Sequence, residues 1–262
     1  WRLLAYYSWA TDNGRILPAD QRVATFRRLY ERCPPEMRPE CGRLYFEYLG
    51  AAARSALKDK PALDGLERAA ARRELSTLLA ATPVAQANVD NLLYGSKDVV
   101  GLLSDAGSTE RRQLTDAWRT ALDRLTAQDD AGALSGPEQL DLVRARILLA
   151  RLDAPDAPLP PALLDEARQA VARVDAATPD GYARHASIYA AAGLLEEAGL
   201  DDEAQRLLVA ELEKSKSPYY FMLELAAQAK KTGRVDEATA WLERAYAGAQ
   251  GPATRFQWGY NY

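Results

Sequence analysis

Apolar residues recur at intervals of three and four along most of the chain, which is the spacing of one face of an α-helix. No stretch alternates Val, Ile and Thr with polar residues in the manner of a strand. Proline and glycine stand where helices would begin and end. The pattern therefore predicts an all-α protein of about 12 helices. The first five are expected near residues 18–33, 40–58, 62–81, 84–104 and 109–127.

Two consecutive segments, 185–218 and 219–252, share one pattern at an offset of 34 residues. The matching residues are Gly199, Asp202, Glu203, Ala204, Leu208 and Pro218 in the first segment and Gly233, Asp236, Glu237, Ala238, Leu242 and Pro252 in the second. A helix, a turn with glycine and a second helix that begins near Asp-Glu-Ala form the tetratricopeptide (TPR) arrangement. The glycine can take the left-handed conformation that ends the first helix, and the small alanine lets the paired helices approach closely.

Each such hairpin can bury its apolar face only against a neighbouring hairpin. We therefore expect a right-handed superhelical stack of hairpins, a TPR-like α-solenoid. The repeat is recognisable in residues 135–262, whereas residues 1–134 are expected to form irregular helical hairpins. Both regions are expected to pack as one continuous array.

The composition argues against two classes of partner. Hydrophobic residues make up 48% of the chain, enough for a substantial core, and the net charge is −4. No positive field is therefore available to hold nucleic acid or anionic lipid. No apolar run approaches the roughly 18 to 20 residues of a membrane span, so we expect no membrane insertion. Because the chain begins at Trp1 without an initiator Met or a leader, we expect it to start inside a longer protein.

The residues that usually carry catalysis are sparse. His185 is the only histidine, which excludes a histidine-based triad and a metal site with several histidine ligands. Acidic residues gather in the first turns of second helices, for example at 201–203, where they complement the helix dipole. Phosphate-binding glycine loops and the G-x-S-x-G and H-E-x-x-H motifs are absent. We therefore expect no catalytic residue, no cofactor and no metal ion in this chain.

The two cysteines, Cys33 and Cys41, lie in the proline-rich segment ERCPPEMRPECGR between two predicted helices. Their spacing differs from the C-x-x-C of thioredoxin-type active sites. The prolines turn the chain back on itself, so a structural disulfide is favoured if the protein is exported. Two unpaired thiols and a redox-active pair remain open as alternatives. A disulfide would favour an oxidising compartment.

Helical arrays of this type bind peptides in a groove lined mainly by the first helix of each hairpin. The candidate groove residues are Tyr189, Tyr219, Tyr220 and Lys230 on first helices, together with Asn88 and Asn91. The two asparagines present amides three residues apart, and the alternative is that they cap or bridge neighbouring hairpins. The rings of the run Tyr219-Tyr220-Phe221 point about 100° apart around a helix. Phe221 or Tyr219 should therefore enter the core while at least one ring faces the groove.

Three strings are more specific than the 34-residue period: NVDNLLYG (Asn88 to Gly95), SPYYFMLELAAQAKKTG (Ser217 to Gly233) and GPATRFQWG (Gly251 to Gly259). They resemble the C-terminal helical region of bacterial thioredoxin-family proteins, some of them thiol-disulfide isomerases. In that family an exported thioredoxin-like domain with C-x-x-C precedes the helical array. The resemblance implies a periplasmic protein whose redox chemistry lies upstream of Trp1. Neither C-x-x-C nor a thioredoxin βαβ pattern occurs in this chain, so no catalytic residue is carried over.

The leading hypothesis is a non-catalytic, helical-repeat domain that binds proteins or peptides. It would present a substrate or partner to the redox domain of a periplasmic thioredoxin-like thiol-disulfide oxidoreductase. The alternative is a free-standing TPR scaffold in an envelope or secretion complex, and the gene sequence upstream of Trp1 distinguishes the two. A third hypothesis makes Cys33 and Cys41 themselves a redox pair.

Overall fold

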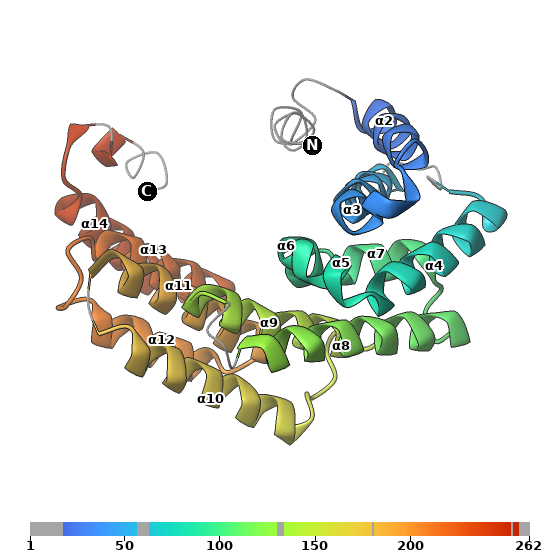
Figure 1. Ribbon diagram of the computed structural model, residues 1–262. Coiled ribbons are helices and arrows are strands. Elements are labelled where there is room, and N and C mark those ends of the chain that lie inside the picture. Colours follow the sequence, from blue (N-terminus) through green and yellow to red (C-terminus); the bar gives the residue numbers. More distant parts are fainter. Residues whose placement is uncertain (1–17, 57–62, 130–133, 180, 253, 257–262) are drawn as a thin grey trace. The chain divides into compact units, whose positions relative to one another are not determined.

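The structure is a computed structural model that describes residues 18–56, 63–129, 134–179, 181–252 and 254–256. Within these ranges the regular structure is helical and no strand occurs, as the sequence pattern predicts (Figure 1). The chain divides into two compact units. Unit 1 is Trp1–Ala133 with Ala145–Pro158, and unit 2 is Leu134–Arg144 with Leu159–Tyr262. That the two regions form one continuous array stays a prediction.

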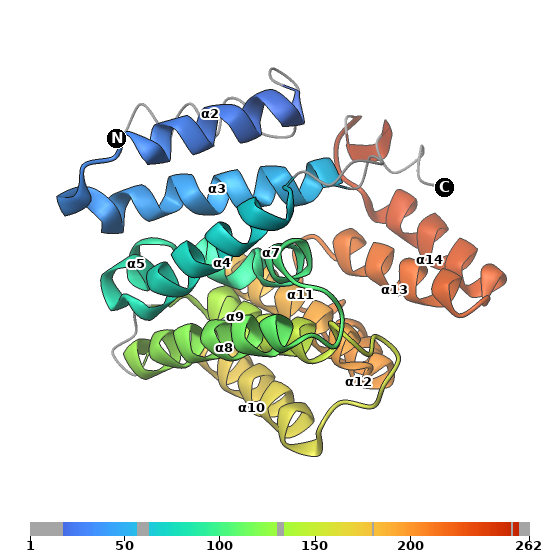
Figure 2. The ribbon, with the colours of Figure 1, turned by 90° about the vertical axis from the view of Figure 1, so that its right-hand side faces the viewer.

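Unit 1 is built from antiparallel helices joined by short connections. Its elements are α2 (Ala19–Glu31), the short 3₁₀ helix η2 (Pro35–Met37), α3 (Arg38–Ala56), α4 (Gly65–Ala80), α5 (Thr82–Ala87), α6 (Val89–Tyr94), α7 (Ser96–Leu103) and α8 (Thr109–Asp129). Helices α2 and α3 lie side by side (Figure 2). Trp118 of α8 is fully buried, and its indole Nε1 donates to the carbonyl oxygen of Leu92 at 3.0 Å. The ring of Phe46 meets it edge-on, so α3, α6 and α8 share one core.

The single helix expected over residues 84–104 is wrong: the segment forms α5, α6 and α7 instead. Asn88 leaves the helical conformation (φ −131°, ψ 34°), and its side-chain Nδ2 donates to the carbonyl oxygen of Val84 at 2.8 Å. Such a local bond competes with helix continuation. Gly95 separates α6 from α7, and a Cβ at this position would lie 2.6 Å from the carbonyl oxygen of Asn91. The chain can therefore turn tightly here only with glycine.

Unit 2 consists mainly of helical hairpins. Its helices are α10 (Pro161–Ala177), α11 (Gly181–Ala198), α12 (Asp201–Glu211), α13 (Tyr219–Lys231) and α14 (Val235–Gly248). Helix α9 (Gly136–Ala150) contributes its residues up to Arg144 to unit 2 and the rest to unit 1.

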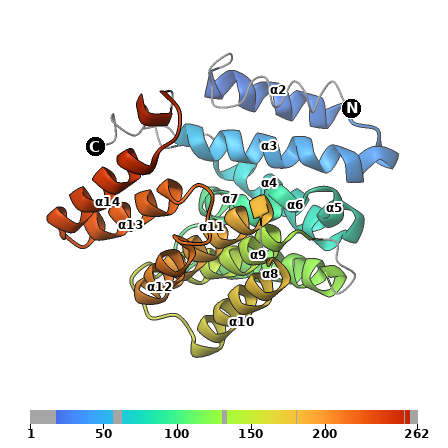
Figure 3. The same ribbon diagram turned by 90° about the vertical axis from the view of Figure 1, so that its left-hand side faces the viewer.

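The turns of the hairpins α11–α12 and α13–α14 have the same geometry at the predicted offset of 34 residues (Figure 3). Gly199 and Gly233 both have φ +77°, the left-handed conformation expected of them. The following amide donates back over five residues at 2.8 Å in both turns, from Leu200 to Leu195 and from Arg234 to Ala229. This bond closes a Schellman motif, which satisfies carbonyls at the helix end.

The core of unit 2 gathers around α11. Its buried side chains are Ile188, Ala192 and Leu195 of α11, Ala204 and Leu208 of α12, and Phe221 and Leu225 of α13, with Trp241 of α14 packed against them. Ala204 and Ala238 lie in the first turns of the second helices, and both are buried. Because part of the surface of α11 packs against α12 and α13, only the remaining part can be exposed to solvent.

Candidate interaction surface

The three aromatic residues at the start of α13 have different surroundings. Phe221 is 1% exposed, whereas Tyr220 is 40% exposed and Tyr219 is half-buried. The expectation that Phe221 or Tyr219 enters the core is thus confirmed for Phe221. His185 of α11 stacks on Phe221 with ring centroids 4.6 Å apart, and it meets the ring of Tyr220 edge-on at 5.4 Å. The rings of Tyr219 and Tyr220 are 4.7 Å apart.

A row of side-chain pairs continues from this aromatic cluster along α11 and α13. Tyr189 is 47% exposed, and its hydroxyl donates to Oε1 of Glu224 at 2.6 Å. Nearer the end of α11, Glu196 Oε1 accepts from Nε2 of Gln228 at 2.6 Å. We call this row the α11–α13 ladder, with the rungs His185 to Tyr220 and Phe221, Tyr189 to Glu224, and Glu196 to Gln228.

The electrostatics of the ladder follow from partial burial and from its two carboxylates. A hydrogen bond to Glu224, burial, and the charges of Glu224 and Glu196 together raise the pKa of Tyr189 to about 12. Burial raises the pKa of Glu196, and the charge of Glu224 adds to this rise. Burial lowers the pKa of His185, which favours its neutral form. The ladder thus combines exposed aromatic rings, a tyrosine hydroxyl that stays protonated at physiological pH, and two neighbouring carboxylates.

The ladder brings some of the sequence-predicted groove residues together. Tyr189 and Tyr220 belong to it, and Tyr219 contacts Tyr220. Lys230 is exposed, but it stands only two residues after Gln228 and therefore points away from the ladder face of α13. Lys231, three residues after Gln228, is on the same face as Gln228. Lys231 lies 3.4 Å from Asp201. Sequence reasoning missed the ladder residues Glu196, Glu224 and Gln228, although Glu224 stands four residues after Tyr220, a spacing that places both on one face.

Asn88 and Asn91 are in unit 1, on a different part of the chain from the ladder. Asn88 is only 3% exposed, and its Nδ2 would lie 3.2 Å from a Cβ at Gly42 of α3. The amide is therefore buried between α5 and α3, its bond to Val84 stays within α5, and it does not lie on an exposed groove surface. Asn91 is half-buried in α6, and its carbonyl oxygen accepts from Gly95 at 2.9 Å. The two asparagines do not lie within one helix over 84–104, because Asn88 stands between α5 and α6 and Asn91 belongs to α6.

In the structure Cys33 and Cys41 are joined by a disulfide, with Cα atoms 6.3 Å apart. The bond spans η2 and connects the end of α2 to the first turns of α3. Both cysteines are buried, at 8% and 0% exposure. The pair therefore lies inside the elbow rather than on its surface.

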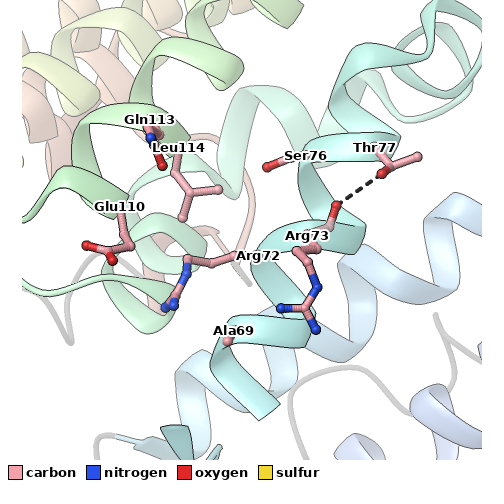
Figure 4. Close-up of a pocket in the computed structure, with 8 residues that line it drawn as sticks. All are labelled: Ala69, Arg72, Arg73, Ser76, Thr77, Glu110, Gln113 and Leu114. Carbon is pink, nitrogen blue, oxygen red and sulfur yellow. Dashed lines mark hydrogen bonds between the residues drawn. The ribbon is translucent and has the colours of Figure 1, made fainter. Parts of the chain in front are cut away.

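Unit 1 contains two pockets of several hundred Å³. One, of about 530 Å³, lies between α4 and α8 (Figure 4), where Arg72 donates to the carbonyl oxygen of Leu103 at 2.8 Å. The other, of about 600 Å³, lies among α2, α3 and α4 and is lined by Tyr48 and Leu66. There Arg27 forms ion pairs with both Glu31 and Glu67.

The described ranges contain no group of three or more His, Cys, Asp or Glu side chains that could hold a metal ion. None of the helices described is both long and apolar enough to cross a membrane. No protein-family model matches the chain, and neither a curated protein nor a solved structure matches it.

Proposed function

We propose that this chain is a helical-repeat domain that binds proteins or peptides, and that the hairpins of unit 2 form a TPR-like stack. In such a stack the first helices, α11 and α13, line the binding groove. One observation carries the proposal: Tyr189 and Tyr220 stand 47% and 40% exposed on these two helices. Rings of this kind, held in place and open to solvent, are frequent anchors of protein interfaces.

Both tyrosines are held in position by their neighbours, which lowers the entropy that binding must remove. Tyr189 is tied to Glu224 through its hydroxyl, and Tyr220 lies against His185 and Tyr219. Beneath them, His185 and Phe221 connect the surface to the core. The face is therefore a preorganised surface, the kind on which a peptide can bind without reordering the helices.

The test is selection of 12-residue peptides from a random display library against the whole chain, followed by affinity measurement on synthetic copies. Tyr189→Ala and Tyr220→Ala should each weaken binding by about tenfold, the cost of losing an interface anchor of more than 1 kcal/mol. Tyr246→Ala is the matched control, because Tyr246 is 46% exposed but lies on the second helix α14. Equal losses in all three variants, or no loss in any, would contradict the assignment of the groove to first helices.

We further propose that this binding domain belongs to a periplasmic thioredoxin-like oxidoreductase and presents a partner to its redox domain. The support is the resemblance of three strings to that family, and the paired Cys33 and Cys41 suit an oxidising compartment. The isolated chain should then neither reduce insulin nor reactivate scrambled ribonuclease. Isomerase activity in this chain would overturn the proposal, whereas a gene with a leader and no upstream C-x-x-C domain would favour the free-standing scaffold.

The reduction potential of the disulfide tests whether Cys33 and Cys41 are a redox pair. A reduction potential below about −300 mV would mark an inert structural bond, whereas a higher potential would indicate a labile pair. Thiol titration of the native protein provides the second measurement.

A further inference from the structure

We infer that the α11–α13 ladder is a docking site for a basic side chain, a lysine or arginine on an extended segment of the bound partner. The inference rests on the proposed function and specifies the chemistry of what the groove takes. Its basis is the distribution of charge and open space around Glu196 and Glu224.

Glu196 and Glu224 are half-buried carboxylates whose hydrogen-bond donors are neutral. Glu224 accepts from the hydroxyl of Tyr189, and Glu196 accepts from the amide of Gln228. Within the described part of the chain neither forms an ion pair, and Lys231, whose charge reaches Glu196, is bonded to Asp201. The adjacent Glu197 differs, because Arg144 lies 3.2 Å from it.

Two like charges that are partly desolvated and close together are unfavourable, and a cation placed between them relieves both effects. Neutral donors orient these carboxylates without compensating their charge, and Lys231 acts on Glu196 only at longer range while it is bonded to Asp201. A positively charged group from another molecule would supply the missing charge. The arrangement therefore selects a cation over a neutral or acidic group.

Gly193 provides the room for such a group. It lies four residues after Tyr189 and three before Glu196, so all three share one face of α11. A Cβ built on Gly193 would meet nothing within 4 Å. A side chain crossing α11 here could lay its methylene groups over the bare helix backbone while its charged end reaches Glu196 and Glu224.

The exposed rings suit the same occupant. Tyr189 borders the open position at Gly193, and aromatic faces attract lysine and arginine through their π-electrons. Arginine adds planar, bidentate hydrogen bonding to carboxylates. An extended basic peptide thus finds an aromatic anchor and acidic partners within about one helical turn of each other.

The experiment uses the random 12-residue display library on the whole chain and synthetic copies of the recovered peptides. Recovered sequences should be enriched in lysine and arginine, and replacing that residue with glutamine should weaken binding. Glu196→Gln and Glu224→Gln should each weaken it by about fivefold, the upper range for one partly exposed ion pair. Glu197→Gln is the matched control, with the same charge change on the neighbouring residue, and should change affinity less than twofold.

Gly193→Gln fills the open position without straining the helix and should also reduce binding. In the unsubstituted protein, a peptide-induced shift of the Gly193 amide resonance would show that the peptide binds at this position.

Three outcomes are distinguishable. The inference is supported if the recovered peptides are enriched in lysine and arginine and if this enrichment is lost when Glu196→Gln or Glu224→Gln is used for the selection. Peptides whose binding needs Tyr189 but shows no basic preference overturn the inference and leave the proposed function standing. No recovered peptide, or binding unaffected by both Tyr189→Ala and Gly193→Gln, overturns both.

Discussion

Glu211 ends α12 as a buried charge, and its replacement should destabilise unit 2 more than any single surface substitution. The residue is 2% exposed. It accepts hydrogen bonds from two nitrogens of Arg184, one of them Nε at 2.9 Å, and from Nζ of Lys214 at 2.8 Å. Arg184 also lies 2.7 Å from Asp175 and donates to the carbonyl oxygen of Thr178 at 2.8 Å. The guanidinium therefore ties the end of α10 to the first turn of α11 and the end of α12.

The perturbation is Glu211→Gln, which keeps the shape and removes the charge. The side-chain oxygen of the glutamine can still accept a hydrogen bond from Arg184, but its NH₂ group would face another N–H of the same guanidinium. Breaking a buried ion pair costs about 3–5 kcal/mol, and we expect about 3 kcal/mol because Arg184 retains Asp175. Lys214 is 59% exposed, so Lys214→Gln should cost less than about 1 kcal/mol.

The assay is urea unfolding followed by circular dichroism, with hydrogen exchange of the α12 amides to assign the change to unit 2. Lys214→Gln serves as the control, and Arg184→Gln with Glu211→Gln completes a double-mutant cycle. With Arg184 already neutral, the second substitution should cost much less. Equal effects of Glu211→Gln and Lys214→Gln, or full additivity in the cycle, would refute the reasoning.

The same network gives a pH dependence with a definite sign. Burial by itself raises the pKa of Glu211, but the hydrogen bonds from Arg184 and Lys214 outweigh it, so the pKa is lowered. A group with a lowered folded-state pKa stabilises the protein above its unfolded-state pKa, here near 4.5, and loses this contribution as the pH falls below it. The stability gap between the natural protein and Glu211→Gln should therefore be widest near pH 7 and narrow in acid.

Three further predictions test other local features. Gly193→Ala should raise the free energy of unfolding by about 0.5–1 kcal/mol, because it removes a mid-helix glycine where a Cβ meets nothing, and a lower urea midpoint would contradict this. Asp64→Ala should cost about 1 kcal/mol and speed hydrogen exchange in the first turn of α4, because Asp64 and Glu67 form a capping box with bonds of 2.8 and 3.0 Å. Ultraviolet titration, with Tyr189→Phe subtracted, should place the pKa of Tyr189 at about 12, and Glu224→Gln should move it back toward 10.0.

Much of unit 2 could be predicted from sequence because its signals are local. Gly199 and Gly233 need the left-handed conformation, which few other residues adopt, so they mark their turns directly. Ala204 and Ala238 are small where two helices meet, and both are buried. The angular spacing of three adjacent rings predicted that Phe221 or Tyr219 enters the core, and the structure places Phe221 there.

The segment 84–104 could not be predicted in the same way. Its apolar spacing is helical throughout, and neither Asn88 nor Gly95 forces a break on its own. The break at Asn88 depends on a close approach of α5 to α3, where Gly42 leaves space for its amide. Tertiary packing decided the local structure here, and Asn88 became part of the core of unit 1.

The ladder shows why a repeat can be found in a sequence while the side-chain contacts between its helices cannot. At the repeat offset of 34, Tyr189 corresponds to Leu223 and Glu196 to Lys230, so alignment pairs each with the wrong residue. The hydrogen bonds instead join residues 35 and 32 apart, to Glu224 and to Gln228, because α11 and α13 approach each other along a face that the period does not specify. Glu196 and Glu224 are brought together only by this packing, and their proximity is what favours a cation. If the proposed function holds, the period identifies the helices that would face a partner, and the contact between those helices identifies the charge that the partner would carry.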